Sequence, residues 1–334
     1  MRAIVVREFG GPGVLRLEEV PDPVAGPGQL LVRVAAAGVQ FVETMTRAGL
    51  MRGTSPAAPK SLPWIPGREV AGDVIAVGQG VDEDWIGRRV SGQTVSLGGS
   101  VAGGYVELAL VEADGANRLP DGLGYGEAVS LLGTGRTALG LVEVAEVGKG
   151  DTVLVESAAG AVGVLSMQLA RAAGAEQIIG LARGAGKLAI AKDFGADLAI
   201  DYAADGWPDQ VRAAAPNGVT VVFDGVGGRI GAAAFDLLAD GGRFVIFGFS
   251  DGTATEIDQT RVAEHRISVL SYFGPPTGPR SPEGQRRLSR DIFAAATAGR
   301  LRTFVGQRFP LAQAAEAHAA IAARKTVGKT VLEP

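Results

Sequence analysis

A run of small residues, Ala158-Ala159-Gly160-Ala161-Val162-Gly163, has the composition of a loop that approaches a phosphate group. It follows the apolar run TVLVES (152–157) and opens the helix-like run VGVLSMQLARAAG. Gly160 would let the backbone approach a pyrophosphate, and Gly163 would let a helix pack closely on the strand with its free N–H groups toward the phosphates. Ala158 replaces the first glycine of the dinucleotide fingerprint, so a plain strand-to-helix turn is the alternative. The strands around the run favour a dinucleotide site.

The end of the next strand distinguishes the two nicotinamide dinucleotides. Enzymes that use NAD place an acidic residue there, about 20 residues past the fingerprint, to bind the ribose 2′-hydroxyl. This chain reads GLARGAGK (180–187), which has no carboxylate and has two cations, Arg183 and Lys187. A 2′-phosphate needs such partners, and arginine binds it with a fork of donors. We therefore predict NADPH. The alternative is that both cations are solvated loop charges.

Cysteine and histidine, which hold most protein-bound zinc, are scarce. The chain has no cysteine and two histidines, His265 and His318. The lack of cysteine excludes disulfides, a thiolate nucleophile and a Cys-ligated metal. The histidines lie far apart in sequence, and His318, in the helical run LAQAAEAHAAIAA, is expected to have a surface or capping role. We expect no metal site.

Length and composition indicate a globular protein of two domains. The chain has 334 residues, of which 46% are apolar and 20% charged, and its net charge is −4. The basic residues are scattered, which argues against a nucleic-acid surface. No apolar run reaches the ~18 residues that span a bilayer, and the first residues, MRAIVVREFGG, turn polar too early for a signal peptide. We expect a cytoplasmic protein that acts on a small molecule.

The first part of the chain contains β-prone runs separated by Gly, Pro and Asp. Alternating apolar and polar residues predict half-buried antiparallel strands, and VETMTRAGL (42–50) predicts one short helix. The predicted strands are AIVVREF, VLRLEEV, QLLVRVAAAGV, REVAGDVIAVG, RRVSG and GYVELALV.

From about Asp121 onward, helical runs alternate with strands that are apolar throughout. A helix is predicted from Glu127 to Glu146, before strands at 152–157, 177–182, 197–202, 219–226, 242–248 and 266–273. Strands buried on both faces predict a parallel sheet covered by helices, which is a doubly wound Rossmann domain. After a Pro/Gly break, a helix at 283–299, a strand, a helix at 311–324 and the strand KTVLEP are expected to rejoin the first domain.

The chain resembles the medium-chain dehydrogenase/reductases, in their zinc-free quinone oxidoreductase (zeta-crystallin-like) subgroup, over essentially its whole length. The resemblance implies an α/β fold in which a Rossmann domain (123–273) is inserted into a GroES-like, mainly-β catalytic domain (1–122 and 274–334). Zinc-dependent relatives carry Cys and His ligands near positions 38 and 67, where this chain reads Gly38-Val39-Gln40 and Gly67-Arg68-Glu69. The matching segments, in family order, are GVQFVETMTRAGL, LPWIPGREVAGDVIAVG, GGYVEL, LGTGRTAL, SAAGAVG, FDGVGG, FGFSDG and KTVGKTVL.

The resemblance also implies which residues bind NADPH. Tyr202, at the mouth of a strand, would serve equally well in packing. Glu69 would orient Arg68 or the cofactor, or fix its own loop through an ion pair. The implied contacts are Gly160, Ala161, Val162 and Gly163 with the pyrophosphate; Arg183, Lys187 and Tyr202 with the 2′-phosphate side; Thr137, Phe247, Phe249 and Ser250 with the ribose and nicotinamide; and, as a weaker match, Lys329.

Hydride transfer to a quinone or an α,β-unsaturated carbonyl places negative charge on a substrate oxygen. Gln40 and Thr44 are the expected catalytic residues, because they could donate hydrogen bonds to that oxygen. The family commonly has Asn where Gln40 stands and a polar residue where Met45 stands, so no proton donor is assigned and solvent would protonate the product. The alternatives are an enoyl-thioester reductase of fatty-acid or polyketide type and a non-catalytic NADPH-binding protein.

The last predicted Rossmann strand, 266–273, is apolar and β-prone and would lie at a sheet edge. An exposed edge of that kind invites pairing with another chain, so we predict a homodimer with this strand on its two-fold axis, as the resemblance also implies. The alternative is that the Pro-rich segment after Gly274 covers the edge within one subunit.

Overall fold

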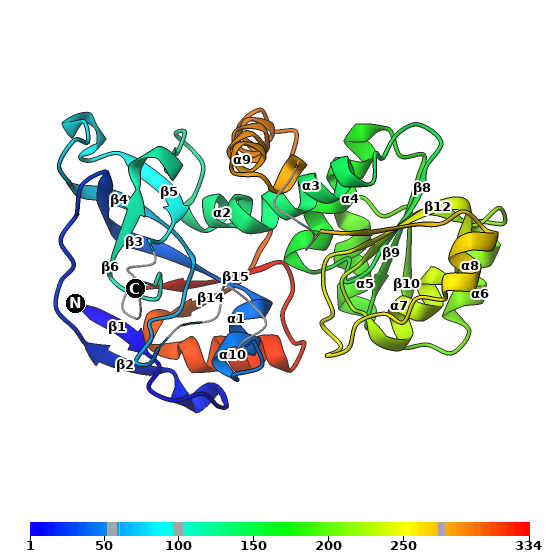
Figure 1. Ribbon diagram of the computed structural model, residues 1–334, viewed down its shortest axis with the longest axis horizontal. Helices are drawn as coiled ribbons and strands as arrows, with labels where there is room; N and C mark the ends of the chain where they lie inside the picture. The colour runs from blue at the N-terminus through cyan, green and yellow to red at the C-terminus, as the bar shows by residue number, and fades with distance from the viewer. Residues whose placement is uncertain (52–58, 60, 96–102, 273–277) are drawn as a thin grey trace. The chain divides into compact units, whose positions relative to one another are not determined.

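The computed structural model describes residues 1–51, 59, 61–95, 103–272 and 278–334, and the chain divides into two compact units (Figure 1). Unit 1 consists of Met1–Gly133 and Phe304–Pro334, and unit 2 of Thr134–Thr303. One unit is therefore inserted into the chain of the other. The division differs from the predicted boundaries at 122/123 and 273/274, because residues 123–133 belong to unit 1 and residues 278–303 to unit 2.

Unit 1 is mainly β-structure. β1 pairs with β2, and the other strands form one sheet in the order β14-β15-β3-β4-β5-β7, with β6 paired to β3. Along β3 the alternating Leu30, Val32 and Val34 point into the apolar core of the unit, as the sequence pattern predicts. The strands are β1 (Arg2–Val5), β2 (Arg16–Glu19), β3 (Gln29–Val39), β4 (Glu69–Val77), β5 (Arg89–Gln93), β6 (Leu108–Glu112), β7 (Asn117–Arg118), β14 (Val305–Pro310) and β15 (Lys329–Glu333).

The helices of unit 1 include α1 (Phe41–Arg47), α2 (Tyr125–Ser130) and α10 (Ala314–Ala322). Short 3-10 turns lie at Pro12–Val14, Glu83–Trp85, Ala113–Gly115 and Leu311–Gln313. No helix in the described part of the chain is both long enough and apolar enough to cross a membrane.

The single helix predicted from Glu127 to Glu146 is wrong. The chain forms α2, a π-helical segment at Leu131–Gly135, and α3 (Arg136–Val144), with non-helical backbone at Leu132 (ψ −115°). The N–H of Gly133 donates to a side chain, Oε1 of Glu69, at 2.6 Å. Two glycines in LLGTG weaken helix propensity here, and a buried carboxylate competes for the backbone donor.

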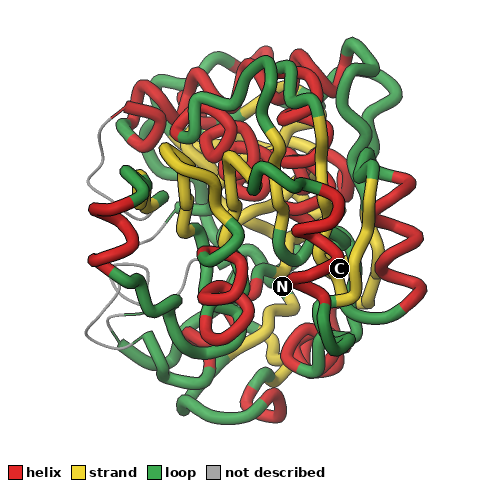
Figure 2. The backbone as a smooth tube through the Cα atoms, turned by 90° about the vertical axis from the view of Figure 1, so that its right-hand side faces the viewer, coloured by secondary structure: helices red, strands yellow, loops and turns green. Residues whose placement is uncertain are grey.

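Unit 2 is the predicted Rossmann domain. Its parallel strands lie in the order β10-β9-β8-β11-β12-β13, which is the doubly wound order 3-2-1-4-5-6 (Figure 1). The strands are β8 (Thr152–Val155), β9 (Gln177–Ala182), β10 (Leu198–Asp201), β11 (Val219–Asp224), β12 (Leu238–Ile246) and β13 (Ser268–Ser271). The helices between them are α4 (Ala161–Ala173), α5 (Ala185–Asp193), α6 (Trp207–Ala214), α7 (Gly228–Phe235) and α8 (Gln259–Glu264), drawn red among yellow strands in Figure 2.

The core of unit 2 explains why its strands read as apolar throughout. Leu154, Ile179, Val222 and Phe244, from four neighbouring strands, are fully buried and belong to one apolar cluster. Because helices pack on the sheet, each strand has few polar positions. The strand predicted at 266–273 is described to Tyr272; Phe273 and the segment 274–277 lie outside the described residues.

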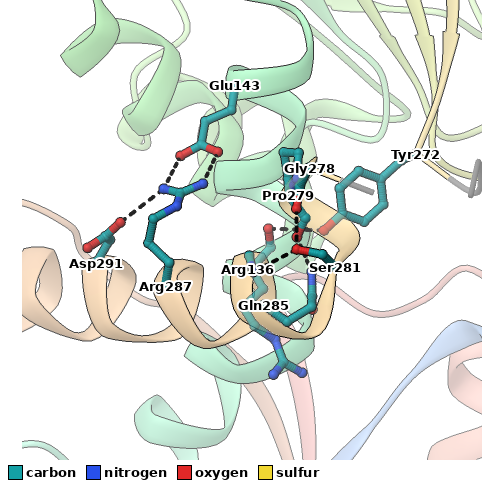
Figure 3. A network of polar contacts seen from close by, with 10 residues as sticks. Arg136, Glu143, Tyr272, Gly278, Pro279, Ser281, Gln285, Arg287 and Asp291 are labelled. Atoms are coloured by element: carbon teal, nitrogen blue, oxygen red, sulfur yellow. Dashed lines mark hydrogen bonds and ion pairs between the residues drawn. The ribbon is translucent and has the colours of Figure 1, made fainter. Parts of the chain in front are cut away.

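α9 (Pro282–Thr297) belongs to unit 2 rather than to the catalytic domain that the sequence predicted. Arg287 of α9 binds Glu143 of α3 through two hydrogen bonds, Nη1 to Oε1 at 2.8 Å and Nη2 to Oε2 at 2.5 Å (Figure 3). Asp291, one turn along α9, accepts a third bond from the same guanidinium at 3.1 Å. The hydroxyl of Tyr272 donates to the carbonyl of Arg136 at 3.3 Å beside this contact. A Pro/Gly break in sequence therefore did not mark a domain boundary.

Candidate functional site

The turn between β8 and α4 has the geometry of a phosphate loop. It is closed by a hydrogen bond from the Gly160 N–H to the Ser157 carbonyl at 2.7 Å, and Ser157 has a left-handed backbone (φ 51°). The N-cap residue of α4 is Gly160, which has no side chain to cap the first N–H groups of the helix. A Cβ on Gly163 would lie 2.5 Å from the Ser157 carbonyl oxygen, so only glycine fits there. The turn can therefore present unsatisfied N–H groups to an anion.

The two predicted cations follow β9 at the same edge of the sheet. Arg183 is exposed in the loop after β9, and Lys187, in the first turn of α5, is partly buried. Tyr202 follows β10 and packs partly buried against the core of unit 2, which is the packing alternative for this residue. The turn after β8 and the loop that carries both cations thus follow neighbouring strands of unit 2.

Asp201, at the end of β10, is a further residue of this region that the sequence did not predict. Its carboxylate accepts hydrogen bonds from the N–H groups of Gly184 and Ala203, each at 2.9 Å. The parallel register sets Asp201 beside Ala182, so this carboxylate shapes the loop that carries Arg183. The position of an Asp at the end of the strand next to β9 could have identified this residue from the sequence.

The residues predicted to face the ribose and nicotinamide lie mainly in the loop after β12. This loop is tied to the end of β11 by three backbone bonds: Phe247 N–H to Asp224 at 2.8 Å, Ser250 N–H to Gly225 at 3.1 Å, and Asp251 N–H to Val226 at 2.8 Å. Phe247, Phe249 and Ser250 therefore lie at the carboxyl edge of the sheet, as the turn before α4 does. Thr137 lies on the first turn of α3 and is partly exposed.

The predicted catalytic residues lie in unit 1, one just before α1 and one within it. Gln40 precedes the helix and is partly exposed. Thr44 is 5% exposed, and its hydroxyl donates to the Phe41 carbonyl at 2.7 Å. That bond uses the only proton of the hydroxyl, so Gln40 is the better placed donor of the two.

Lys329 and Glu69 form a buried ion pair in unit 1. Nζ of Lys329 lies 3.1 Å from Oε2 of Glu69, and their side chains are 2% and 1% exposed. A Cβ on Gly133 would lie 2.2 Å from Oε1 of Glu69 and 3.3 Å from Nε2 of Gln40, so these groups gather around one glycine. The ammonium of Lys329 thus has a partner within its own unit, and Glu69 binds Lys329 and not Arg68, which is exposed.

A buried polar chain that the sequence did not predict lies behind α1. Tyr105 donates its hydroxyl proton to Oε2 of Glu43 at 2.7 Å, and Nε2 of His318 lies 3.0 Å from the same hydroxyl. Glu43 in turn accepts from the Gln40 N–H at 2.9 Å. The chain Tyr105–Glu43 therefore holds the backbone of Gln40 at the start of α1.

Burial dominates the electrostatics of this chain. Burial raises the pKa of Glu43 to about 7, against the hydrogen bonds from Gln40 and Tyr105, which lower it. Burial also lowers the pKa of His318 to about 3, and the charge of Arg47 adds to that effect. The expected surface or capping role of His318 is wrong, because its side chain is fully buried. Ala314 and Ala317 lie on the same buried face of α10 as His318. This helical spacing of apolar residues could have predicted that His318 is buried.

Comparison with known proteins identifies the family. Residues 26–121 match the alcohol dehydrogenase GroES-like domain, and residues 161–283 match a family described as zinc-binding dehydrogenase. A quinone oxidoreductase of Pseudomonas aeruginosa is 33% identical to the chain and aligns over 98% of it and 97% of the relative. The chain belongs to the quinone oxidoreductase group of the medium-chain dehydrogenase/reductase superfamily.

Solved structures of this superfamily match the whole chain. The Escherichia coli quinone oxidoreductase, solved with NADPH, is 28% identical, with a TM-score of 0.87 and full coverage of both chains. A mycobacterial protein, also solved with NADPH, is 36% identical at a TM-score of 0.87, again with full coverage of both. A structure named as an NAD-dependent alcohol dehydrogenase matches as well (30% identity, TM-score 0.88, full coverage of both), so the fold alone does not choose the cofactor.

Zinc chemistry, which the name of the second matching family mentions, does not fit the residues of this member of the superfamily. The chain has no cysteine, and the described residues contain no group of three or more His, Asp or Glu side chains that could hold a metal ion. Near position 67, close to which zinc-dependent relatives carry a ligand, the carboxylate of Glu69 is paired with Lys329. A reductase without a metal ion stays our prediction.

Proposed function

We propose that this protein reduces quinones or α,β-unsaturated carbonyl compounds with NADPH, without a metal ion. The observation that supports it best is the turn 157–160 and α4 beside Arg183 and Lys187, on a Rossmann sheet of the quinone oxidoreductase group. NADPH is the cofactor, and it supplies the hydride from its nicotinamide C4.

The residues of unit 2 suit the parts of NADPH. The N–H groups of Ala161, Val162 and Gly163, with the backbone of Gly160, would bind the pyrophosphate. Arg183 and Lys187 would bind the 2′-phosphate. The loop with Phe247, Phe249 and Ser250 would hold the nicotinamide side, because it lies at the same edge of the sheet.

The role of the protein in the chemical step is to stabilise charge on the substrate oxygen. The amide of Gln40 would donate a hydrogen bond to that oxygen, and the Glu43–Tyr105 chain would keep Gln40 in position. Thr44 stays a weaker candidate, since its proton is used within α1. Solvent would deliver the proton that completes the reduction.

A substrate screen tests this function. NADPH oxidation is followed with a panel of quinones, conjugated enones and enoyl thioesters, with saturated ketones as the matched control. Turnover of quinones or enones, and none of saturated ketones, is the expected result. Preference for enoyl thioesters would move the protein to the fatty-acid or polyketide type of reductase, and a flat signal with every compound would contradict an enzymatic role.

We also propose that the protein is a homodimer through β13. This strand is at the edge of the sheet, and its residues Ser268, Val269 and Ser271 are exposed. The Tyr272 N–H bonds back to Ile246 of β12, so by alternation the N–H of Val269 points outward from the edge. A second copy would pair there antiparallel across a two-fold axis.

Light scattering at micromolar concentration tests the dimer. We expect twice the chain mass of 34.1 kDa for the wild type and for Val269→Thr, which keeps the outward N–H. Val269→Pro removes that donor and should give monomers. A wild-type monomer, or a Val269→Pro variant that stays dimeric, would contradict the proposal.

The expected location in the cytoplasm remains a prediction.

A further inference from the structure

Two fully buried carboxyl groups lie side by side at the carboxyl edge of the parallel sheet. Glu156 follows β8 and Asp224 ends β11, and both are 0% exposed. The register pairs Phe223 with Val155, so one residue further along the two carboxyl-bearing positions are opposite each other. Neighbouring strands of one parallel sheet thus direct two acidic side chains to the same place.

Three of the four carboxyl oxygens accept hydrogen bonds. Oε2 of Glu156 accepts from the N–H groups of Gly225 and Val226, at 3.2 and 2.9 Å. Oδ1 of Asp224 accepts from the Gly227 N–H at 2.8 Å, and Oδ2 accepts from the Thr255 hydroxyl at 2.5 Å. Among the residues that the structure describes, no donor is directed at Oε1 of Glu156, which is buried. A proton on that oxygen would turn it into the donor that the pair lacks.

Nearby cations do not neutralise the pair. The other titratable side chains on the elements packed around it are Arg171 of α4, Arg229 of α7, and Asp240 and Arg243 of β12, with Asp251, Glu256 and Asp258 in the loop that follows. Arg171 binds Asp197, Arg243 binds Asp151, and Asp240 binds His265. Arg229, Asp251, Glu256 and Asp258 are exposed. Within the described residues, neither Glu156 nor Asp224 belongs to an ion pair.

Two adjacent buried carboxylates without a cation cannot both be ionised near neutral pH. Burial raises the pKa of Glu156 well above its usual range, and the charge of Asp224 and a hydrogen bond to it raise that pKa further. The proton therefore belongs on Glu156, between the two groups.

The pair lies between two segments of the proposed NADPH site. Glu156 immediately precedes the turn 157–160, and it holds the N–H groups of Gly225 and Val226. The carbonyls of those two residues in turn accept from Ser250 and Asp251, in the loop that carries Phe247 and Phe249. One side chain thus connects the pyrophosphate turn to the nicotinamide loop.

We propose that Glu156 and Asp224 share one proton and act as a positioning pair for NADPH, so that loss of this proton at higher pH weakens NADPH binding. The proposal rests on the proposed use of NADPH. The pyrophosphate would bring negative charge to the turn that begins next to Glu156, which disfavours the ionised pair in the complex. By linkage, a group that binds its proton more tightly in the complex makes affinity fall as pH rises.

NADPH titrations from about pH 6 to about pH 9 test the pair. We expect wild-type affinity to fall about tenfold over this range, which corresponds to a pKa difference of about one unit between the free protein and the complex. Glu156→Gln keeps a donor toward Asp224 and has no proton to lose, so it should lose this fall. Glu256→Gln, an exposed residue next to Thr255, is the matched control and should keep the wild-type profile. The cofactor's own 2′-phosphate titrates equally in every variant and cancels in the comparison.

Two further measurements keep the proposal falsifiable. Asp224→Asn removes the charge that opposes ionisation of Glu156, so the fall should move to lower pH. Glu43, with its pKa of about 7, gives an infrared band of a neutral carboxylic acid in both proteins near neutral pH. The wild type should show a second such band, and Glu156→Gln should lose it. Equal pH profiles for wild type and Glu156→Gln, an unmoved fall in Asp224→Asn, or no second band would overturn the pair.

These outcomes are distinct from failure of the proposed function. A protein that binds NADPH with this profile but reduces no quinone or enone would refute the proposed activity and leave the pair intact. A protein that binds no NADPH would refute the proposed cofactor use, and with it the effect on binding. The second infrared band would then decide, by itself, whether the proton is shared.

Discussion

We expect single residues to decide which cofactor this protein prefers and how its stability responds to pH. Arg183 is an exposed cation at the end of β9, so its contribution to binding depends on a partner that the free protein lacks. Glu43 and His318 are buried, so their contributions act on folding itself. A charged group is stable only in water or beside a partner. Arg183 is therefore tested by cofactor binding, and Glu43 and His318 are tested by the pH dependence of unfolding.

We expect at least ~10-fold preference for NADPH over NADH, or about 1.4 kcal/mol, from binding titrations with both cofactors. Arg183→Ala should lose most of this preference by weakening NADPH alone, because only NADPH has the 2′-phosphate. Lys192→Ala, the same loss of charge at the exposed end of α5, is the control and should keep it. Equal binding of the two cofactors by the wild type would contradict the assignment.

Glu43 and His318 should have opposite effects on the pH dependence of stability. The pKa of Glu43 is raised in the folded state from 4.5 to about 7, so its contribution is fully present below about pH 4.5 and is lost as pH rises to about 7. The pKa of His318 is lowered from 6.5 to about 3, so the folded protein loses stability as pH falls below about 6.5. Each group changes the free energy of unfolding by up to about 1.4 kcal/mol per pH unit.

Denaturant unfolding from about pH 5 to about pH 8 measures this effect. Relative to wild type, Glu43→Gln should gain stability as pH rises, and His318→Gln should lose stability as pH rises toward 6.5. Glu316→Gln, exposed on the helix that carries His318, is the control and should follow the wild type. Parallel curves for all four proteins would show that neither buried group titrates as described.

At the scale of elements, the close approach of α4 to the end of β8 makes the cofactor turn possible. A side chain at Gly163 would meet the Ser157 carbonyl and the Cα of Ala158, at 2.5 and 2.8 Å, and both are backbone atoms that cannot rotate away. The turn and the helix would have to separate. The N–H groups that we propose to bind the pyrophosphate belong to that first helical turn, so we expect packing and binding to be coupled here.

Gly163→Ala should therefore weaken NADPH binding by at least about tenfold and destabilise the protein by about 1–3 kcal/mol, as overpacking does. Gly186→Ala is the matched control, because a Cβ there meets nothing within 4 Å in a helix of the same unit. Alanine at that position should stabilise α5 by up to about 1 kcal/mol. Titration and thermal unfolding of both variants check this, and wild-type affinity in Gly163→Ala would refute the close approach.

At the scale of the whole molecule, the amino-acid composition and the pairing of distant residues both argue against a zinc site. The total absence of cysteine removes the ligands that zinc prefers. The carboxylate of Glu69, near one of the positions where zinc-dependent relatives carry a ligand, is paired with Lys329. In the function that we propose, NADPH therefore supplies the hydride and hydrogen-bond donors of the protein, in place of a metal ion, stabilise the charge on the substrate oxygen.

Chelators should consequently change neither the unfolding temperature nor NADPH-dependent turnover. Dialysis against a strong chelator, followed by both measurements, checks the expectation. Added zinc should not increase turnover either. Elemental analysis that finds one tightly bound zinc per chain would refute it.

The sequence by itself was sufficient for the features that short stretches of chain determine. The apolar strands of the Rossmann sheet, the small residues before α4 and the missing cysteines are each visible within a few residues or in the composition, so they predicted the fold class, the cofactor turn and the exclusion of Cys-ligated zinc. The resemblance to the quinone oxidoreductase group, carried by segments along the whole chain, was confirmed by the relatives.

Only the tertiary structure decided which distant residues share a buried site. The partners Tyr105 and His318 are 213 residues apart, and Glu69 and Lys329 are 260 apart. Periodicity reports which face of an element is buried but not what lies against it. For the same reason the sequence misplaced His318 on the surface and assigned α9 to the wrong unit, whereas the break after α2 depends on a carboxylate from β4. A charge is buried only where the fold supplies its partner, and that partner comes from long-range contacts.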